Sequence, residues 1–420
     1  MATSRDARGR LVLGGVALEE VAALAGTPTY VYDLGAVRAG VREITAAFGG
    51  DPHLVAYAVK ANSAGPVVRA VAAEGAGADV VSGPELALAL GAGISPDRIV
   101  YSGVAKTDAE LDLAVAAQIR GVQIESVEEV ERVAARARAA SRRVKVAIRV
   151  NPEVDLETLA THQGIATGHD DAKFGVALSD FGRAFSAVLA QPELELVGLT
   201  THVGSQFTQI EPYVVAARRL FELAAEVASR APLSYLDTGG GFGIDYGQGC
   251  PVAPADFVRA VRAERDRAGF GGMTLVCEPG RSLVASHGVL LSRVVQRKVS
   301  GERRWLMIDA GMNDLVRPAM YQARHRIVPV EPPAAPSVGQ RVVGPVCESS
   351  DDFGSCALPE RGFELVAILD AGAYGYTMAS AYNGRALPAE VFVEDGKVAF
   401  VRPRAAASAW VEERLAAGRA

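Results

Sequence analysis

Lys60 ends an apolar stretch whose composition predicts a buried strand. In HLVAYAVKANS, residues 53–63, four of the five residues at 55–59 are small or β-branched apolar, and Pro52 precedes the stretch. A lysine at a strand end often extends its ammonium group into solvent. If it is desolvated instead, its pKa falls and the neutral amine becomes a nucleophile toward a carbonyl group.

Three further motifs carry groups suited to binding an anion or a ring. DTGGGFG, residues 237–243, offers consecutive backbone N–H groups for a phosphate dianion, although three glycines can also form only a flexible turn. HVGSQ, residues 202–206, offers an imidazole and a serine, and EPGRS, residues 278–282, offers a carboxylate and a guanidinium. Taken alone, the histidine could be packed in a core and the acid and arginine could form a local salt bridge.

Together with Lys60, these motifs match the needs of one cofactor. A lysine can form a Schiff base, a glycine run can bind phosphate, an imidazole can stack on a ring, and an acid can keep a pyridine nitrogen protonated. These are the requirements of pyridoxal 5′-phosphate. The four cysteines form no CxxC pair and have no histidine at ligand spacing, so we expect no metal site.

The elements that must position these residues alternate regularly from residue 54 onward. Short apolar runs alternate with Ala-rich amphipathic segments such as 64–74, 108–117 and 127–139, which predicts parallel strands joined by helices. Eight runs favour a closed (β/α)8, TIM-like barrel. An open doubly wound sheet is the alternative, but its glycine-rich fingerprint is absent after the first strand. The predicted strands are 54–59, 78–81, 98–101, 121–124, 144–150, 194–201, 233–236 and 273–277.

Chemically active residues recur at the ends of these runs. In (β/α)8 barrels, catalytic residues gather at the carboxyl ends of the strands. A barrel built only for stability has no reason to place lysine, histidine, arginine and acids there repeatedly, so we expect them to line one site. They are Lys60, Asp79, Ser102, Glu125, Arg149, Asn151, His202, Ser205, Asp237–Gly241 and Glu278–Arg281.

One polar segment, 151–175, interrupts the alternation and contains His162 and His169. Long loops inside compact domains are usually functional covers or disordered segments. We expect this one to cover the barrel mouth, with both histidines facing solvent.

The pattern changes after Arg281, where apolar runs follow one another without helices. We therefore expect a C-terminal antiparallel β domain over 286–420, after a barrel over 35–285. The N-terminal segment 1–34 includes a strand at 29–33 that could belong to either domain, and we expect the segment to pack with the β domain. The predicted C-terminal strands are 288–299, 304–309, 324–330, 340–346, 363–370 and 390–401.

The composition excludes several classes of partner. The chain has 420 residues, a formal net charge of −6 and a pI near 5.7, and no Lys or Arg run suited to a nucleic acid. No stretch approaches about eighteen uninterrupted apolar residues, and the N-terminal residues are polar and charged. We expect a cytoplasmic protein without a membrane partner.

The motifs occur in the order found in a known family. YAVKAN, HVGSQ, DTGGGFG, EPGRS, CES (347–349) and GAYGYTMASAYN (372–383) span most of the chain. The chain resembles the alanine-racemase-like, fold type III pyridoxal-phosphate decarboxylases and, among these, the diaminopimelate decarboxylases. Two positions depart from the family pattern: Ala381 stands where asparagine is common, and SSDDFG (349–354) has an additional acid.

The resemblance implies roles for the cofactor-binding residues. Lys60 would carry the internal aldimine, His202 would stack on the pyridine ring, and Glu278 would pair with the ring nitrogen. Ser205, Gly241, Gly280 and Tyr374 would hold the phosphate. The full set implied to bind pyridoxal 5′-phosphate is Lys60, Asp79, Arg149, His202, Ser205, Gly240, Gly241, Glu278, Gly280 and Tyr374.

The resemblance also implies a reaction and a homodimer. The reaction is decarboxylation of meso-2,6-diaminopimelate to L-lysine and CO2, the last step of lysine biosynthesis. Two arginines can clamp the distal carboxylate and an acid can bind the distal ammonium. Cys347 and Glu348 would reach into the partner's site, and Cys347 and Lys60 are both candidates to donate the proton to Cα. The implied substrate contacts are Arg281, Arg317, Tyr321, Glu348 and Tyr374.

Other interpretations stay open at this point. A related fold type III decarboxylase acting on another amino acid, or on a carrier-tethered one, would share the motifs, although Gln322 stands where ornithine-type members have an acid. An inactive homologue would usually lack the lysine, the cysteine or the glycine run, and all three are present. A racemase is disfavoured, because in that chemistry an arginine and not Glu278 would pair with the ring nitrogen.

Overall fold

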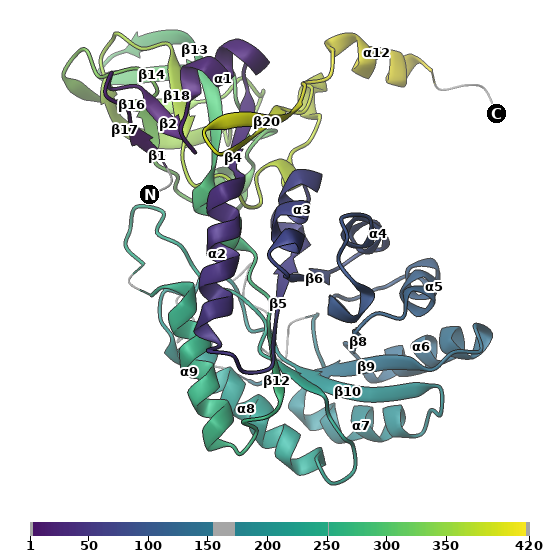
Figure 1. Ribbon diagram of the computed structural model, residues 1–420. Helices are drawn as coiled ribbons and strands as arrows, with labels where there is room; N and C mark the ends of the chain where they lie inside the picture. The colour runs from purple at the N-terminus through teal and green to yellow at the C-terminus, as the bar shows by residue number, and fades with distance from the viewer. Residues whose placement is uncertain (1–2, 154–172, 251, 417–420) are drawn as a thin grey trace. The chain divides into compact units, whose positions relative to one another are not determined.

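The computed structural model describes residues 3–153, 173–250 and 252–416. The chain divides into two compact units (Figure 1). The barrel unit consists of residues 38–244 and 250–282, and the β unit consists of residues 1–37, 245–249 and 283–420.

Within the described residues, the barrel unit contains eight parallel strands that close in the order β10-β11-β12-β5-β6-β7-β8-β9. The (β/α)8 prediction is therefore confirmed, and the open-sheet alternative is wrong. The register pairs the last residues of neighbouring strands, for example Ala58 with Asp79 and Thr200 with Asp237, so the strands end at one common mouth. The strands are β5 (His53–Ala58), β6 (Gly77–Val80), β7 (Ile99–Tyr101), β8 (Gly121–Ile124), β9 (Val144–Arg149), β10 (Leu194–Thr200), β11 (Tyr235–Asp237) and β12 (Thr274–Cys277).

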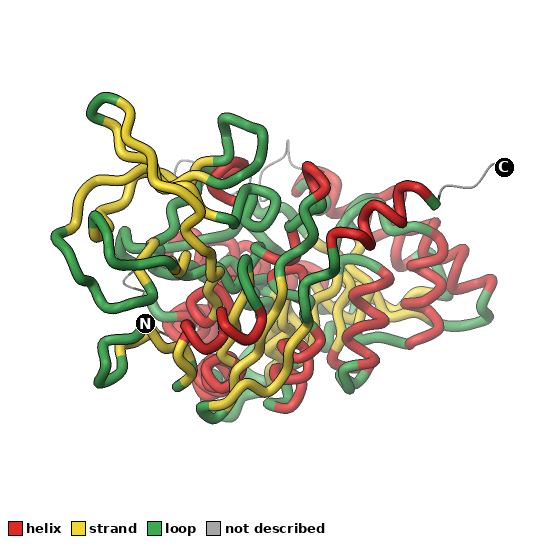
Figure 2. Tube along the Cα trace, turned by 90° about the horizontal axis from the view of Figure 1, so that it is seen from above, coloured by secondary structure: helices red, strands yellow, loops and turns green. Residues whose placement is uncertain are grey.

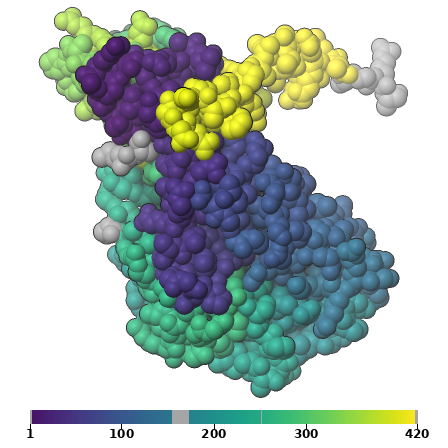
Figure 3. All heavy atoms as spheres, viewed as in Figure 1, coloured from purple at the N-terminus to yellow at the C-terminus, as the bar shows by residue number. Residues whose placement is uncertain are grey.

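Helices cover the outside of the barrel strands (Figure 1). In the space-filling view the colours of the barrel surface change from blue to green in the order of the chain (Figure 3). Several begin at a capping residue that the sequence supplies: Ser82 and Ser126 accept a backbone N–H, and Thr107 forms a capping box with Glu110. The helices are α2 (Leu34–Ala47), which begins in the β unit, α3 (Gly65–Ala73), α4 (Gly83–Gly91), α5 (Asp108–Ala117), α6 (Val127–Ala139), α7 (Phe181–Leu189), α8 (Glu211–Val227), α9 (Pro254–Arg267) and the short α10 (Arg281–Val284).

The β unit is built around the long strand β13 (Gly288–Ser300). The strand from the N-terminal segment, β4 (Thr29–Asp33), lies between β13 and β19 (Ala389–Glu394), so both ends of the chain contribute to this sheet. A core of buried residues that includes Val31, Val289, Leu291 and Val391 holds it together. The other elements are β1 (Thr3–Arg5), β2 (Leu11–Leu13), β3 (Val16–Ala17), β14 (Arg303–Ile308), β15 (Ile327–Pro329), β16 (Ser337–Val343), β17 (Asp352–Pro359), β18 (Leu365–Ile368), β20 (Lys397–Arg402), α1 (Leu18–Ala25), α11 (Arg317–Tyr321) and α12 (Ala407–Leu415), the red helix beside the C-terminus in Figure 2.

Several details of the β unit differ from the sequence prediction. The domain was expected to be antiparallel, but β4 pairs with β19, and β14 with β16, in parallel. The separate sheet of β1, β2 and β3 was not predicted. The single strand predicted at 390–401 is a hairpin, β19 and β20, because Asp395 and Gly396 both adopt a positive φ and form a tight turn. The strand β17 was not predicted. His162 and His169, and most of the predicted covering loop, lie outside the described residues. No helix in the described ranges is both long enough and apolar enough to cross a membrane.

Candidate active site

Lys60 lies just beyond β5, in a short 3₁₀ turn at Val59–Ala61. Its Nζ donates a hydrogen bond to Oδ2 of Asp79 at 2.5 Å, and the hydroxyl of Ser102 donates to the other Asp79 oxygen. Asp79 is fully buried, whereas the lysine side chain is 34% exposed. The ammonium group is therefore directed at a buried carboxylate at the barrel mouth.

Two more carboxyl groups lie together inside the barrel, Asp237 at the end of β11 and Glu278 just after β12. Nε2 of Gln123 donates to Glu278 Oε1 at 3.1 Å and to Asp237 Oδ2 at 3.4 Å. Burial raises the pKa of Asp237 to about 6, and burial together with the charges of Asp237 and Asp79 raises the pKa of Glu278 well above its usual value. The pair therefore favours a shared proton or a nearby cation.

His202 follows β10 and lies beside Glu278. Its Nδ1 accepts the backbone N–H of Gly240 at 3.1 Å and is 3.9 Å from Glu278 Oε2. Burial, and then the positive charges of Arg149 and Lys60, lower the pKa of His202 well below its usual value. The imidazole is therefore neutral near pH 7, with Nδ1 as an acceptor and its proton on Nε2.

Glu125, just after β8, fixes the position of Arg149 at the end of β9. Arg149 Nη1 donates to Glu125 Oε1 at 3.1 Å, and both residues are buried. Glu125 also accepts the backbone N–H groups of Gly103 at 2.6 Å and Gly175 at 2.8 Å. One carboxylate thus holds the arginine and two loops of the barrel mouth together.

The glycines of the site are required by close backbone approach. A Cβ on Gly240 would overlap the carbonyl oxygen of Glu278, and a Cβ on Gly241, whose φ is +95°, would overlap that of Gly204. A Cβ on Gly280 would make a tight contact of 3.0 Å with the side chains of both Ala58 and Ala61. No side chain of these glycines therefore stands between a ligand and the backbone, while the N–H groups of Gly239 and Gly240 donate to Asp237 Oδ1 and His202 Nδ1.

Ser205 and Arg281 are also brought together at the barrel mouth. Nη2 of Arg281 donates to the Ser205 hydroxyl at 3.0 Å. Arg281 is 5% exposed, so its charge is directed inward. These two side chains follow β10 and β12 respectively, at the same end of the barrel as Lys60.

Asn151, in the barrel unit, is buried, and its backbone N–H donates to the carbonyl oxygen of Val176 at 2.9 Å. The other predicted residues belong to the β unit. Arg317 is buried at the start of α11, and its Nη1 donates to Nε2 of His325 at 2.9 Å. Tyr321 and Tyr374 are partly buried, and Tyr374 adopts a positive φ of 55°.

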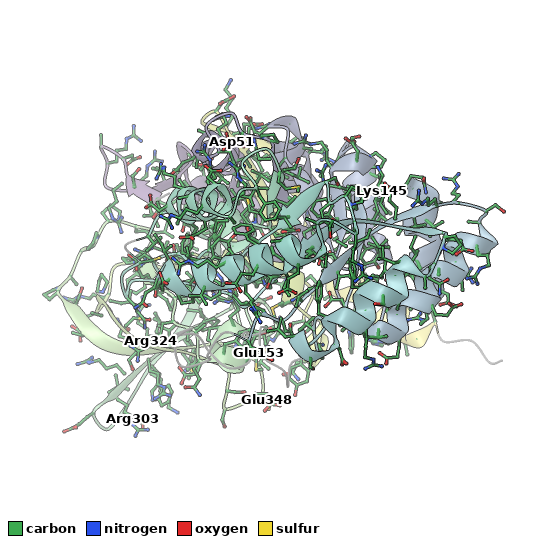
Figure 4. The ribbon with its side chains drawn as sticks, turned by 90° about the horizontal axis from the view of Figure 1, so that it is seen from below. Asp51, Lys145, Glu153, Arg303, Arg324 and Glu348 are labelled. Carbon is green, nitrogen blue, oxygen red and sulfur yellow. The ribbon has the colours of Figure 1, made fainter. Side chains whose placement is uncertain are left out.

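Cys347 and Glu348 are exposed on a turn of the β unit, where the Glu348 side chain points away from the ribbon (Figure 4). The backbone N–H of Cys347 donates to Asn383 Oδ1 at 2.9 Å, and the Tyr382 hydroxyl donates to Glu348 at 2.6 Å. Buried Asp351 holds the base of the turn by accepting the N–H of Val346 at 2.7 Å. These hydrogen bonds support the turn, and both side chains are exposed.

The two neighbouring acids of SSDDFG, Asp351 and Asp352, have different contacts. Asp351 is 3% exposed and anchors the turn, whereas Asp352 forms an ion pair with the exposed Arg341. The additional acid therefore has a surface partner.

The barrel residues fit pyridoxal 5′-phosphate on the basis of their charges. Asp79 pairs with Lys60 and Glu125 pairs with Arg149, whereas Asp237 and Glu278 face each other and the neutral amide of Gln123. A protonated pyridine nitrogen would supply the positive charge that this pair favours. The amine, the glycine run and the neutral imidazole complete a matching set.

Sequence reasoning missed Gln123, which connects the two carboxyl groups, and the several contacts of Glu125. A glutamine between apolar residues of a predicted buried strand, GVQI, was the available signal. A polar side chain at an inward position of a strand needs a partner inside the barrel.

Comparisons with known proteins agree with this site. The family described as "Pyridoxal-dependent decarboxylase, pyridoxal binding domain" matches residues 34–285. The chain is 42% identical over 403 residues to the diaminopimelate decarboxylase of Zymomonas mobilis, covering 94% of each chain, and 40% identical over 404 residues to that of Pseudomonas aeruginosa, covering 95% of each. The structure matches Helicobacter pylori diaminopimelate decarboxylase complexed with L-lysine with a TM-score of 0.89 and 35% identity, covering 94% of this chain and 99% of that one.

These matches extend over both units, and the family match spans nearly all of the barrel and its site residues. The cofactor is pyridoxal 5′-phosphate. The chain belongs to the pyridoxal-dependent decarboxylases and, within them, to the diaminopimelate decarboxylases.

Proposed function

We propose that this protein decarboxylates meso-2,6-diaminopimelate to L-lysine and CO2. The observation that carries the proposal is the similarity, over almost the whole chain, to relatives named for this activity. The H. pylori structure that contains L-lysine supports the identity of the product. Retention of Lys60, Cys347 and the glycine run supports an active enzyme.

Lys60 and Glu278 have the central roles in holding the cofactor. Pyridoxal 5′-phosphate supplies an electron sink for the negative charge left on Cα when a carboxylate departs. Asp79 directs the Lys60 amine into the barrel, Glu278 keeps a proton on the ring nitrogen, and neutral His202 packs on the ring without adding charge. Arg149 contributes to the positive field of the mouth, and the phosphate is held by Ser205, Gly241, Gly280 and Tyr374.

The substrate is recognised by the groups at its far end. Diaminopimelate carries a second carboxylate and a second ammonium, and guanidinium groups bind carboxylates through two parallel charge-assisted hydrogen bonds. Arg281 and Arg317 bind the distal carboxylate, Glu348 binds the distal ammonium, and Tyr321 and Tyr374 complete the contacts.

The enzyme acts as a homodimer in which Cys347 and Glu348 complete the partner's site. Their exposure on an ordered turn supports this role, because such side chains are available to a second subunit. Protonation of Cα is assigned to Cys347, with Lys60 as the alternative donor.

Measuring CO2 release from a panel of amino acids tests the proposal. The purified protein, loaded with pyridoxal 5′-phosphate, should release CO2 and form L-lysine from meso-diaminopimelate. Ornithine, arginine, lysine and glutamate derivatives should be turned over at least about 100-fold more slowly, because they lack one of the distal charges. Absence of lysine formation from diaminopimelate, with turnover of another amino acid, would overturn the assignment.

A further inference from the structure

The side chain of Gln123 connects two carboxyl groups inside the barrel. Its Nε2 donates to both Glu278 Oε1 and Asp237 Oδ2, and the residue is only 1% exposed. Its backbone oxygen accepts Nζ of the buried Lys106 at 2.8 Å, which fixes β8 at this point. The side-chain amide keeps its two carboxyl acceptors, because a buried N–H without an acceptor would be strongly destabilising.

This contact gives the two oxygens of Glu278 different surroundings. Oε1 accepts the amide of Gln123, while Oε2 lies on the side of His202, 3.9 Å from its Nδ1. A carboxylate with one oxygen held cannot rotate freely. Oε2 therefore stays on the side where the proposed function places the cofactor ring.

Asp237 extends the connection to the glycine run. Its Oδ1 accepts the N–H of Gly239 at 2.9 Å, and its Oδ2 accepts the amide of Gln123 at 3.4 Å. One path of hydrogen bonds thus runs from the glycine run through Asp237 and Gln123 to Glu278.

We propose that Gln123 is a positioning residue for the cofactor. By holding Glu278 Oε1, it would leave Oε2 to pair with the ring nitrogen, and by bridging to Asp237 it connects Glu278 with the glycine run. The inference rests on the proposed role of Glu278 and is independent of which amino acid is the substrate.

Two substitutions of Gln123 test the inference without an activity assay. Gln123→Met keeps the length of the side chain but removes the donor, and Gln123→Glu keeps its shape but donates only when protonated. The measurement is the dissociation constant of pyridoxal 5′-phosphate, followed by the absorbance band at about 420 nm between pH 5.5 and 8. Gln340→Met is the matched control, because Gln340 is also buried and donates its amide to Leu358 O and Pro359 O in the β unit.

Gln123→Met should weaken cofactor binding about 10-fold or more, the usual effect of losing a hydrogen bond to a charged group. Gln123→Glu should bind the cofactor much less tightly at pH 8 than at pH 5.5, because the ionised carboxylate repels Glu278 whereas the acid can donate to it. Gln340→Met should bind the cofactor as the native protein does.

Native cofactor binding by a folded Gln123→Met protein would overturn the inference, and so would an equal loss in Gln340→Met. If Gln123→Met fails to fold, Gln123→Glu decides the question, since pH-independent binding would contradict the positioning role. A native protein that binds the cofactor but does not decarboxylate diaminopimelate would refute the proposed function and leave this inference standing.

Discussion

The Nζ atom of Lys60 lies 2.5 Å from Oδ2 of Asp79, so a partly exposed lysine is directed into the barrel by a carboxylate on the neighbouring strand. Replacing Asp79 with Asn keeps the shape but removes the charge that orients the amine. Cofactor added to the Asp79→Asn apoprotein should develop its absorbance band about 10-fold more slowly. Ser102→Ala, which removes only a donor to the other Asp79 oxygen, should have a smaller effect. Equal rates in native protein and Asp79→Asn would exclude this role.

Glu278→Gln should lower kcat by about 100-fold while the protein still binds the cofactor, because an amide cannot stabilise a protonated ring nitrogen. Steady-state kinetics with diaminopimelate and the absorbance spectrum measure the two quantities separately. Glu85→Gln is a suitable control, since Glu85 is a partly buried carboxylate near the same mouth that accepts the N–H of Val81. Equal losses in both variants would point to a general effect of removing a buried charge.

Stability against pH tests the state of His202. Its pKa is lowered first by burial and then by Arg149 and Lys60, so the unfolded chain takes up this proton near pH 6.5 and the folded chain only at lower pH. The stabilising contribution is complete above about pH 6.5 and is lost as pH falls through the folded pKa. His202→Gln apoprotein should therefore lose less stability than native apoprotein between about pH 7 and pH 5, as measured by urea unfolding. Parallel pH curves for the two proteins would contradict a neutral, partly buried imidazole.

Gly240→Ala should both destabilise the barrel and abolish tight cofactor binding, because its Cβ would overlap the carbonyl oxygen of Glu278. We expect a loss of about 2 kcal/mol or more in unfolding free energy. Gly182→Ala in α7 is the matched control, since no atom lies within 4 Å of its added Cβ. That variant should gain about 0.5–1 kcal/mol through better helix propensity. Native cofactor binding by Gly240→Ala would show that the run is only a turn.

Mixing two inactive variants tests the shared site. Lys60→Ala and Cys347→Ala each remove a different part of the same proposed site, so each homodimer should be nearly inactive. After unfolding and refolding together in equal amounts, half of the dimers are mixed and each contains one intact site, so about a quarter of native activity should return. No recovery, in a mixture shown by mass spectrometry to contain mixed dimers, would place both residues in the same subunit's site.

The barrel was predictable because each strand is a short apolar run that ends in a polar group. The run before Lys60 and the run 194–201 both show this pattern, and parallel strands necessarily bring their carboxyl ends to one mouth. The strand β17 was harder to predict because Gly354 and Ser355 interrupt its apolar pattern. The hairpin of β19 and β20 was signalled by Asp395 and Gly396, a pair typical of tight turns.

The site was predictable where residues belong to motifs and unpredictable where their role depends on contact. Lys60, His202 and Glu278 stand in recognisable sequences. Gln123 does not, and its importance arises only because barrel closure brings β8 opposite β11 and β12.

The most direct test of the account is to find which lysine carries the cofactor. Borohydride converts a Schiff base between a lysine and pyridoxal 5′-phosphate into a stable amine, and peptide mass mapping then locates the modified residue. The account predicts modification of Lys60 and none of Lys106, whose Nζ is buried in contact with Glu129 at 2.9 Å. Modification of another lysine, or of no lysine, would contradict it.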